Sequence, residues 1–197
     1  MNNKYLETIK SLDGEIYHLE YHQQRLEEVL ESLGQTTIHS LKEHLKPPKS
    51  GLYRCRVLYD EKEIHVSYYP YEKRLVESLK LLYDDTLEYS KKYANRDALN
   101  KLFMLRGNCD DILVVQNGLI TDTSIANIAL YDGLNWCTPK KPLLKGTTRT
   151  RLLESGQLIE KDIRVDALQN YSKVALMNAM LDFDIIAIEN IRNLFVR

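Results

Sequence analysis

The chain has 197 residues, and its 27 lysine and arginine residues nearly balance its 28 aspartate and glutamate residues, for a formal net charge of −1. A chain of this length can bury a substantial core in one large domain or in two small ones. The positive charges form no basic stretch, which argues against a nucleic-acid partner. The apolar runs are too short to cross a bilayer, and the polar start lacks a signal-peptide core. We therefore expect a cytoplasmic protein with no nucleic-acid or membrane partner.

The chain is expected to open with a β-hairpin and an amphipathic helix. Asp13-Gly14 supplies the positive φ angles of a tight turn between strands at residues 5–9 and 15–18. Apolar residues then recur at helical spacing over residues 20–33, and Gly34 follows as a C-terminal cap.

A second helix and two more strands are expected next. Thr36 or Thr37 caps a helix that must end at Pro47-Pro48, because proline lacks the amide donor. Residues 51–60 and 63–69 follow as two strands joined by a polar turn.

The domain boundary is expected in the polar stretch 84–93, which follows an apolar segment at residues 76–83. We predict a small α+β domain over residues 1–86 and a larger domain over residues 87–197.

The second half predicts an antiparallel meander. A helix near residues 98–103 ends at Gly107, and Asn117-Gly118 is a strong hairpin signal. A short helix follows Gly146 and closes at Gly156. The expected strands cover residues 112–116, 119–131, 134–137, 174–177 and 185–188.

Several side chains could carry chemistry, and each also has an ordinary interpretation. Asp122 lies on a strand and should face a ligand, or is simply a hydrogen-bonded strand acid. The hydroxyls and free amides of Thr147 and Thr148 at a helix start suit a phosphate, or form an ordinary N-cap. Arg25, beside the apolar stripe of the first helix, could reach a phosphate or form a surface salt bridge.

A pair of lysines and a pair of arginines also have both a functional and an ordinary interpretation. Lys91 and Lys92 precede a helix, and a lysine forms an imine with an aldehyde only when its amine can lose its proton. Arg54 and Arg56 share a strand face and are candidates for a substrate carboxylate, or are two solvent-facing arginines.

Other familiar motifs are missing from the sequence. It has no GxSxG elbow, phosphate-binding GxxxxGK[ST] loop, GxGxxG turn or HExxH helix. Its three cysteines are widely spaced, and His18 and His22 have no acid or cysteine cluster beside them. We expect neither a metal site nor a disulfide framework.

Six segments occur in an order that is typical of one family. They are Leu6-Glu7-Thr8-Ile9 with Asp13-Gly14, His22-Gln23-Gln24-Arg25-Leu26, Lys92-Tyr93-Ala94-Asn95-Arg96, residues 117–128, residues 138–149, and Met177-Asn178-Ala179. In this order they resemble the class IV aminotransferase family, fold type IV of the pyridoxal-phosphate enzymes. The resemblance implies an α+β fold of the D-amino acid aminotransferase type, with a small α/β domain and a larger antiparallel β-rich domain.

The resemblance also implies a cofactor, pyridoxal 5′-phosphate, and a role for each matching residue. Lys92 holds the cofactor as a Schiff base, and the spacing to Asn95 selects it over Lys91. Asp122, where the family usually has glutamate, contacts the pyridine nitrogen. The phosphate contacts are assigned to Arg25, Thr147, Thr148 and Asn178.

The function implied by the resemblance is a reaction on a small amino substrate by a homodimer. Asn95-Arg96 is typical of the lyase branch, which predicts a 4-amino-4-deoxychorismate lyase of folate biosynthesis that forms 4-aminobenzoate and pyruvate. Arg96 joins Arg54 and Arg56 as a substrate-binding candidate. The alternatives are an aminotransferase of the branched-chain or D-amino acid type and a catalytically impaired, cofactor-binding relative.

Overall fold

The computed structural model describes residues 4–36, 39–186 and 194–196. The chain forms two compact units, and both mix strands with helices, so the expected α+β class is confirmed. The first unit takes the residues up to Lys73 together with Lys91–Asn95, and the second takes Arg74–Ser90 and the residues from Arg96 onward.

This division differs from the expected boundary at residue 86. The strand β5 (Leu79–Tyr83) pairs in parallel with β6 (Asp111–Gln116), so the residues around it belong to the second unit. The short segment Lys91–Asn95 returns to the first unit because its backbone pairs with β1 (Tyr5–Leu12). Sequence patterns do not show such long-range pairing.

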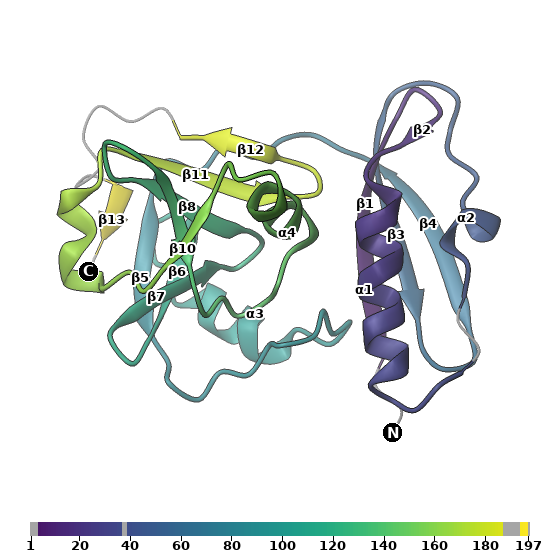
Figure 1. Cartoon of the computed structure of the whole chain (residues 1–197), viewed down its shortest axis with the longest axis horizontal. Helices are drawn as coiled ribbons and strands as arrows, with labels where there is room; N and C mark the ends of the chain where they lie inside the picture. Colours follow the sequence, from purple (N-terminus) through teal and green to yellow (C-terminus); the bar gives the residue numbers. More distant parts are fainter. Residues whose placement is uncertain (1–3, 37–38, 187–193, 197) are drawn as a thin grey trace. The chain divides into compact units, whose positions relative to one another are not determined.

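The first unit is an antiparallel sheet with one long helix packed on it, as Figure 1 shows for α1 (Leu19–Glu31). The strand order is β2-β1-β3-β4, where β2 is Glu15–Ile16, β3 is Leu52–Tyr59 and β4 is Ile64–Pro70. Leucine and valine side chains of α1 fill the core with the inward-facing residues of the strands, including Ile9, Cys55 and Val57. The alternating burial of β1 places Glu7 on this same inner face.

Both turn signals of this unit are confirmed. Asp13 and Gly14 adopt φ angles of 49° and 88°, which join β1 to β2 in a tight hairpin. Gly34 has φ 78° and donates its N–H to Glu31, so it closes α1 as expected. The expected second helix is shorter than predicted, because α2 covers only Leu41–His44. Thr37 lies outside the described residues.

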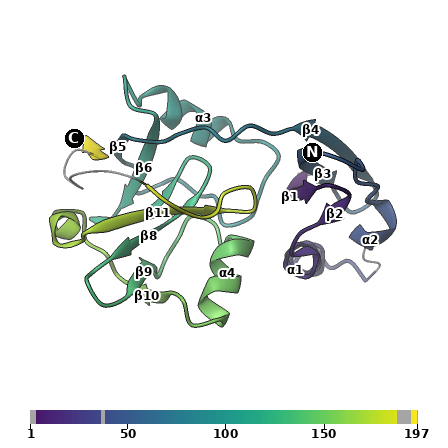
Figure 2. The same ribbon diagram turned by 90° about the horizontal axis from the view of Figure 1, so that it is seen from above.

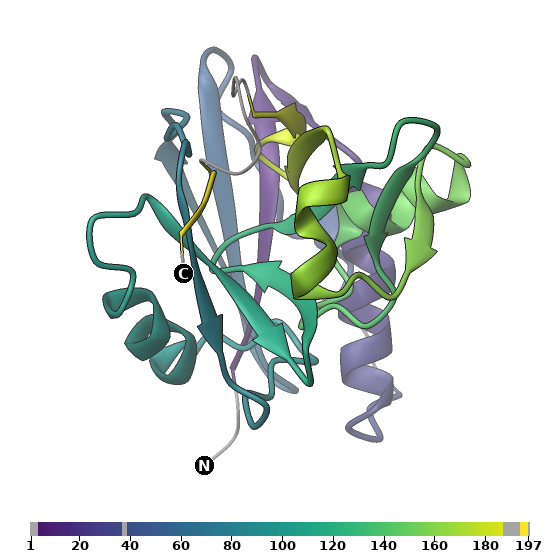
Figure 3. The same ribbon diagram turned by 90° about the vertical axis from the view of Figure 1, so that its left-hand side faces the viewer.

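The second unit is built around one large sheet. The strand order is β10-β9-β8-β7-β6-β5-β13, and β11 pairs with β8 and with β12. The bounds are β7 Leu119–Thr123, β8 Asn127–Tyr131, β9 Trp136–Pro139, β10 Ile159–Lys161, β11 Lys173–Asn178, β12 Asp182–Ile185 and β13 Phe195–Val196. Figure 3 shows β5, β6 and β13 side by side. The predicted meander is confirmed for β6 to β9, which pair antiparallel in sequence.

Helices cover this sheet at two places. The strand β6 is buried on both faces, and α3 (Asp97–Met104) packs with Leu99 against its Ile112 and Val114. The helix α4 (Thr147–Glu154) packs against β11, as seen in Figure 2. A 3-10 helix, η1, covers Val165–Asn170. None of the helices in the described ranges is long and apolar enough to cross a membrane.

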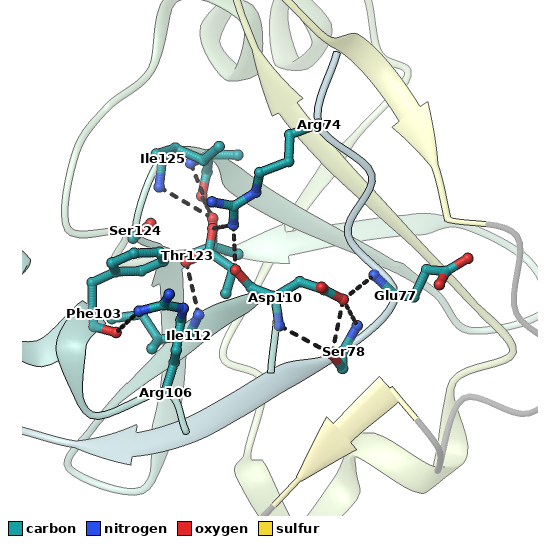
Figure 4. Close-up of polar contacts among 12 residues, drawn as sticks. Arg74, Glu77, Ser78, Phe103, Arg106, Asp110, Ile112, Thr123, Ser124 and Ile125 are labelled. Atoms are coloured by element: carbon teal, nitrogen blue, oxygen red, sulfur yellow. Dashed lines mark hydrogen bonds and ion pairs between the residues drawn. The ribbon is translucent and has the colours of Figure 1, made fainter. Parts of the chain in front are cut away.

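The expected single strand at residues 119–131 is wrong, because β7 and β8 are separate strands joined by a tight turn. The N–H of Thr123 donates to the carbonyl of Ala126 at 2.9 Å, and the Ala126 N–H donates to the Thr123 hydroxyl at 3.0 Å. Figure 4 shows this hydroxyl at the centre of the turn. The turn brings Asp122 directly opposite Asn127 in the register.

Asp110 anchors the entry to β5 and β6 in the second unit. One of its carboxylate oxygens accepts hydrogen bonds from the Ser78 hydroxyl at 2.8 Å and from the Glu77 N–H at 2.9 Å (Figure 4). Arg74 donates to the Asp110 carbonyl in the same cluster. These contacts lower the pKa of Asp110, chiefly through the Glu77 amide. Asp110 therefore links the segment before β5 to the start of β6.

Candidate active site

Lys92 lies in the first unit, on an extended segment along the edge of β1. The N–H of Leu6 donates to the carbonyl of Lys92 at 2.9 Å, and the N–H of Ala94 donates to the carbonyl of Lys4 at 2.8 Å. The Lys92 side chain is half-buried. Its backbone is therefore held by a strand rather than by a free loop, which suits a lysine that must present its amine at one place.

The neighbouring lysine is used differently. Lys91 Nζ donates to the Ser32 hydroxyl at 2.6 Å, just beyond the end of α1. The same ammonium lies 6.0 Å from the centre of the Tyr5 ring. These contacts occupy the amine of Lys91 with groups of its own unit. The structure thus separates two residues that the sequence distinguished only by their spacing to Asn95.

Arg25 forms a buried ion pair rather than a surface salt bridge. Its Nε donates to Glu7 Oε1 at 2.8 Å, and its Nη2 donates to Glu7 Oε2 at 2.5 Å. The Glu7 side chain is 0% exposed, and its Oε2 also lies 2.6 Å from His22 Nδ1. His22 and Arg25 are three residues apart on α1, so both side chains face β1. A guanidinium has five N–H groups, which leaves donors for an anion.

Burial and the neighbouring charges shift the pKa values of Glu7 and His22. Complete burial alone would raise the pKa of Glu7, but the Arg25 charge and the hydrogen bonds from His22 and Arg25 outweigh it and lower that pKa from 4.5 to about 2. Burial is also the main reason that the pKa of His22 is lowered, and the positive charges of Arg25 and Lys92 add to this effect. His22 is therefore neutral and Glu7 ionised at neutral pH.

A loss of stability in acid follows from Glu7. Its carboxylate stabilises the fold above the unfolded-state pKa of 4.5, and this contribution should disappear as the pH falls from about 4.5 to about 2. The full effect is about 3 kcal/mol by proton linkage. Urea unfolding at several pH values measures it. The Glu7→Gln variant should show a clearly shallower loss in this window, and an equally steep loss would contradict the assignment.

Asp122 is the central acid of the second unit. Its side chain is 4% exposed, and both oxygens accept hydrogen bonds: Oδ1 from Asn127 Nδ2 at 2.8 Å and Oδ2 from the N–H of Leu144 at 2.9 Å. Burial raises its pKa from 3.8 to about 6, although these donors and the charge of Arg149 oppose the rise. Within the described part of the chain, no cationic side chain forms an ion pair with Asp122. The site therefore suits a protonated ring nitrogen as its partner.

The start of α4 suits an anion. Gly146 occupies the N-cap position, and no side chain caps the helix. The N–H groups of the first turn and the positive end of the helix dipole are therefore available to an anion. Thr147 and Thr148 follow and are buried. No hydrogen bond among the residues that the structure covers uses either hydroxyl. Amides and hydroxyls together form a donor set typical of phosphate sites.

Gly146 is needed for space, not for backbone conformation. Its φ of −73° is available to any residue, but a Cβ at this position would lie 2.0 Å from Asn127 Oδ1. The Asn127 side chain cannot easily yield, because Nδ2 donates to both Asp122 and the Leu144 carbonyl at 2.8 Å. The glycine thus allows the helix start to approach the Asp122 network.

Gly146→Ala should consequently destabilise the second unit and disturb Asp122. Overpacking of this kind costs about 1–3 kcal/mol, measurable as a lower midpoint in urea unfolding. Gly156→Ala provides a comparison without overpacking, because an added Cβ there meets nothing within 4 Å and its loss of stability reports only the strain at φ 71°. Equal stability of Gly146→Ala and the parent would show that Asn127 moves freely.

The other predicted site residues lie as follows. Asn178 Oδ1 accepts from the N–H groups of Met180 and Leu181, each at 2.9 Å, so this side chain shapes the turn between β11 and β12. Its Nδ2 donates to the Ile125 carbonyl at 3.2 Å. Arg96 donates to the Ser124 carbonyl in the β7–β8 turn. Their roles toward phosphate and substrate stay predictions.

Arg54 and Arg56 share one face of β3, as their spacing predicts. Cys55 between them is buried, so the arginines lie on the face of the sheet that α1 does not cover. Arg54 is exposed and stacks 5.6 Å from the centre of the Tyr69 ring. Their role toward a substrate carboxylate stays a prediction.

The structure thus forms two clusters, one in each unit. Lys92 and Arg25 lie in the first, and Asp122, Thr147 and Thr148 lie in the second. Sequence reasoning assigned no role to Glu7 and His22 in the first cluster or to Asn127 in the second, and it used Gly146 only to mark the start of a helix. All four stand inside or beside the recognised segments, but only their burial and partners reveal a role.

Comparison with known proteins identifies the family of this chain. The family model described as amino-transferase class IV matches residues 4–188. The chain belongs to the class IV aminotransferase family. The resemblance read from the six segments is thereby confirmed. Members of this family are pyridoxal-phosphate-dependent enzymes, so the family assigns the chain to an enzyme class without naming its substrate.

Individual relatives support the same family over nearly the whole chain. An uncharacterized protein of Haemophilus influenzae is 34% identical over 180 residues, which span 88% of this chain and 96% of that protein. The crystal structure of "a putative 4-amino-4-deoxychorismate lyase" from Haemophilus somnus 129PT is 32% identical, with a TM-score of 0.82 over 91% of this chain and 97% of its own.

A more distant structure supports the fold alone. The pyridoxal-phosphate-bound form of a hypothetical aminotransferase from Mycobacterium tuberculosis is 17% identical, with a TM-score of 0.77 over 93% of this chain and 80% of its own. The two-unit α+β architecture is therefore that of class IV aminotransferases.

Proposed function

We propose that the protein is a pyridoxal-phosphate-dependent 4-amino-4-deoxychorismate lyase. The observation that carries the cofactor assignment is the buried carboxylate of Asp122, which has hydrogen-bond donors but no ion-pair partner among the described residues. A buried acid with a pKa raised to about 6 gains from a cationic partner. The nearby α4 start supplies donors for a phosphate.

The residues would divide the work as follows. When bound, pyridoxal phosphate supplies an aldehyde that captures the substrate amine and a ring that accepts electrons from the breaking bond. Asp122 would keep the ring nitrogen protonated, and Thr147, Thr148 and Arg25 would bind the phosphate. Lys92 Nζ would hold the cofactor between turnovers. During turnover Lys92 would take the proton from the carbon that bears the amine and return a proton as the products form.

The lyase assignment is the finer part of the proposal. It rests on the Asn95-Arg96 pair and on the similarity to the structure from Haemophilus somnus, which is described as "a putative 4-amino-4-deoxychorismate lyase". In this reaction the substrate ring becomes aromatic as 4-aminobenzoate, and the side chain leaves as pyruvate. The homodimer, the cytoplasmic location and a place in folate biosynthesis stay predictions from the resemblance.

Two measurements test the proposal. Purified protein incubated with pyridoxal phosphate should develop the visible absorption of a lysine-bound cofactor, and it should release pyruvate from aminodeoxychorismate. Protein that stays colourless with excess cofactor would overturn the cofactor assignment. Keto-acid formation from a panel of amino acids, without pyruvate release from aminodeoxychorismate, would replace the lyase with an aminotransferase. Cofactor binding without any turnover would identify an impaired relative.

A further inference from the structure

Asn127 closes a ring of hydrogen bonds between two separate parts of the second unit. Its Nδ2 donates to Asp122 Oδ1 and to the Leu144 carbonyl, each at 2.8 Å. The N–H of the same Leu144 donates to Asp122 Oδ2 at 2.9 Å. Asp122, Asn127 and Leu144 are thus linked pairwise, and Asp122 Oδ1 and the Leu144 carbonyl both face Asn127 Nδ2. This fixes the orientation of the Asn127 amide.

The carbonyl end of this amide meets the start of α4. Asn127 Oδ1 lies so close to Gly146 that a Cβ there would be 2.0 Å away. Leu144 and Gly146 belong to the segment that leads into Thr147 and Thr148. One buried side chain therefore touches the acid of β7 on one side and the entry to the helix on the other.

We propose that Asn127 is a positioning residue that sets the spacing between Asp122 and the N-terminus of α4. This inference rests on the proposed cofactor, whose rigid pyridine ring and short phosphate ester arm limit the separation between ring nitrogen and phosphate to a narrow range. Two protein groups bind its ends together only when their own separation matches. Asn127 holds that separation because it hydrogen-bonds to the acid and packs against the helix entry.

The chemistry of asparagine suits this role. A planar amide offers two donors on one nitrogen, and both are used here on oxygen acceptors. Aspartic acid has the same size but provides one donor at most, and alanine provides none. The aspartate variant therefore removes at least one hydrogen bond without leaving a cavity, and the alanine variant removes both and leaves a cavity.

The experiment compares cofactor affinities by absorption or fluorescence titration. Asn127→Ala and Asn127→Asp are each titrated with pyridoxal phosphate and with pyridoxal, which lacks the phosphate. Thr121→Val is the matched control: Thr121 is on the same strand next to Asp122, and its buried hydroxyl donates to the Val114 carbonyl at 2.8 Å without contacting the network. Apoprotein melting curves establish that each variant is folded at the temperature used.

The expected pattern has two parts. Asn127→Ala should raise the dissociation constant for pyridoxal phosphate by about tenfold or more, and Thr121→Val should change it by less than about twofold. The loss should be larger for pyridoxal phosphate than for pyridoxal, because both ends of the former are displaced. Asn127→Asp should show the same pattern, because its carboxyl group faces two acceptors and can donate to one of them at most. It decides the question if Asn127→Ala does not fold.

Each contrary result has a separate meaning. Equal losses for the two ligands would show that Asn127 acts on Asp122 alone, and parent-like affinity in both variants would show no positioning role. Either outcome overturns the inference and leaves the proposed function intact. A parent protein that binds neither ligand overturns the proposed function itself.

Discussion

Lys92→Ala should abolish the covalent cofactor adduct and reduce turnover by about a thousandfold or more, the scale of a lost acid–base group. The phosphate donors and Asp122 remain in this variant, so noncovalent cofactor can still bind. Borohydride reduction followed by peptide mapping reads the result directly. The parent should carry the reduced cofactor on the peptide that contains Lys92, and the variant should carry none.

Lys91→Ala is the matched control for this experiment. Lys91 Nζ already donates to the Ser32 hydroxyl, so its removal should leave the adduct and turnover in place. Both substitutions remove one lysine from the same five-residue segment, which balances general effects on charge. A reduced cofactor on Lys91, or on any lysine other than Lys92, would contradict the assignment.

Asp122→Asn should lower turnover by about 10²–10³-fold, the scale of a lost electrostatic contact to the reacting group. The substitution keeps the size of the side chain and removes the charge that a protonated ring nitrogen requires. Rapid-quench or steady-state kinetics on saturating cofactor measure the effect on turnover. Undiminished turnover at saturating cofactor would show that the ring nitrogen does not depend on Asp122.

The same variant should change the pH dependence of the cofactor-free protein. Because burial raises the pKa of Asp122 from 3.8 to about 6, its folded form prefers the proton, and its contribution to stability is lost as the pH rises from about 4 through 6. Asp122→Asn should lack this loss. Asp122→Glu is the informative third variant, since the extra methylene must displace Asn127 or Leu144 in a packed site.

Local turn chemistry was readable from the sequence. Asn117 and Gly118 adopt φ angles of 51° and 75°, and the hairpin between β6 and β7 forms where the dipeptide predicts it. Glycine at position 156 also ends α4 with φ 71°, as expected. Such signals are intrinsic to one or two residues and need no partner elsewhere in the chain.

The turn between β7 and β8 was missed because it contains none of these residues. Thr123 to Ala126 contains no glycine, proline or asparagine, and the reversal depends on the Thr123 hydroxyl and on Arg96, which donates to the Ser124 carbonyl from outside the hairpin. The consequence for the candidate site was large, since only this reversal places Asn127 opposite Asp122.

The burial of the acidic side chains and their partners also could not be predicted from the sequence. Glu7 and Asp122 are both acids on strands, yet the first has a pKa lowered to about 2 and the second a pKa raised to about 6. The difference lies in whether a guanidinium from another element reaches the carboxylate. Arg25 reaches Glu7 across 18 positions of sequence, a contact that periodicity does not encode.

The pairing of residues 91–95 with β1 also bears on the order in which the chain folds as it is synthesised. The strands and helices up to Lys73 emerge first, and β1 can pair with β2 and β3 at once. The Leu6 N–H and the Lys4 carbonyl must wait for Lys92 and Ala94, about ninety residues later. Until then that edge of β1 is an open template for other strands. The lysine segment therefore completes and protects the first unit as well as carrying its candidate nucleophile.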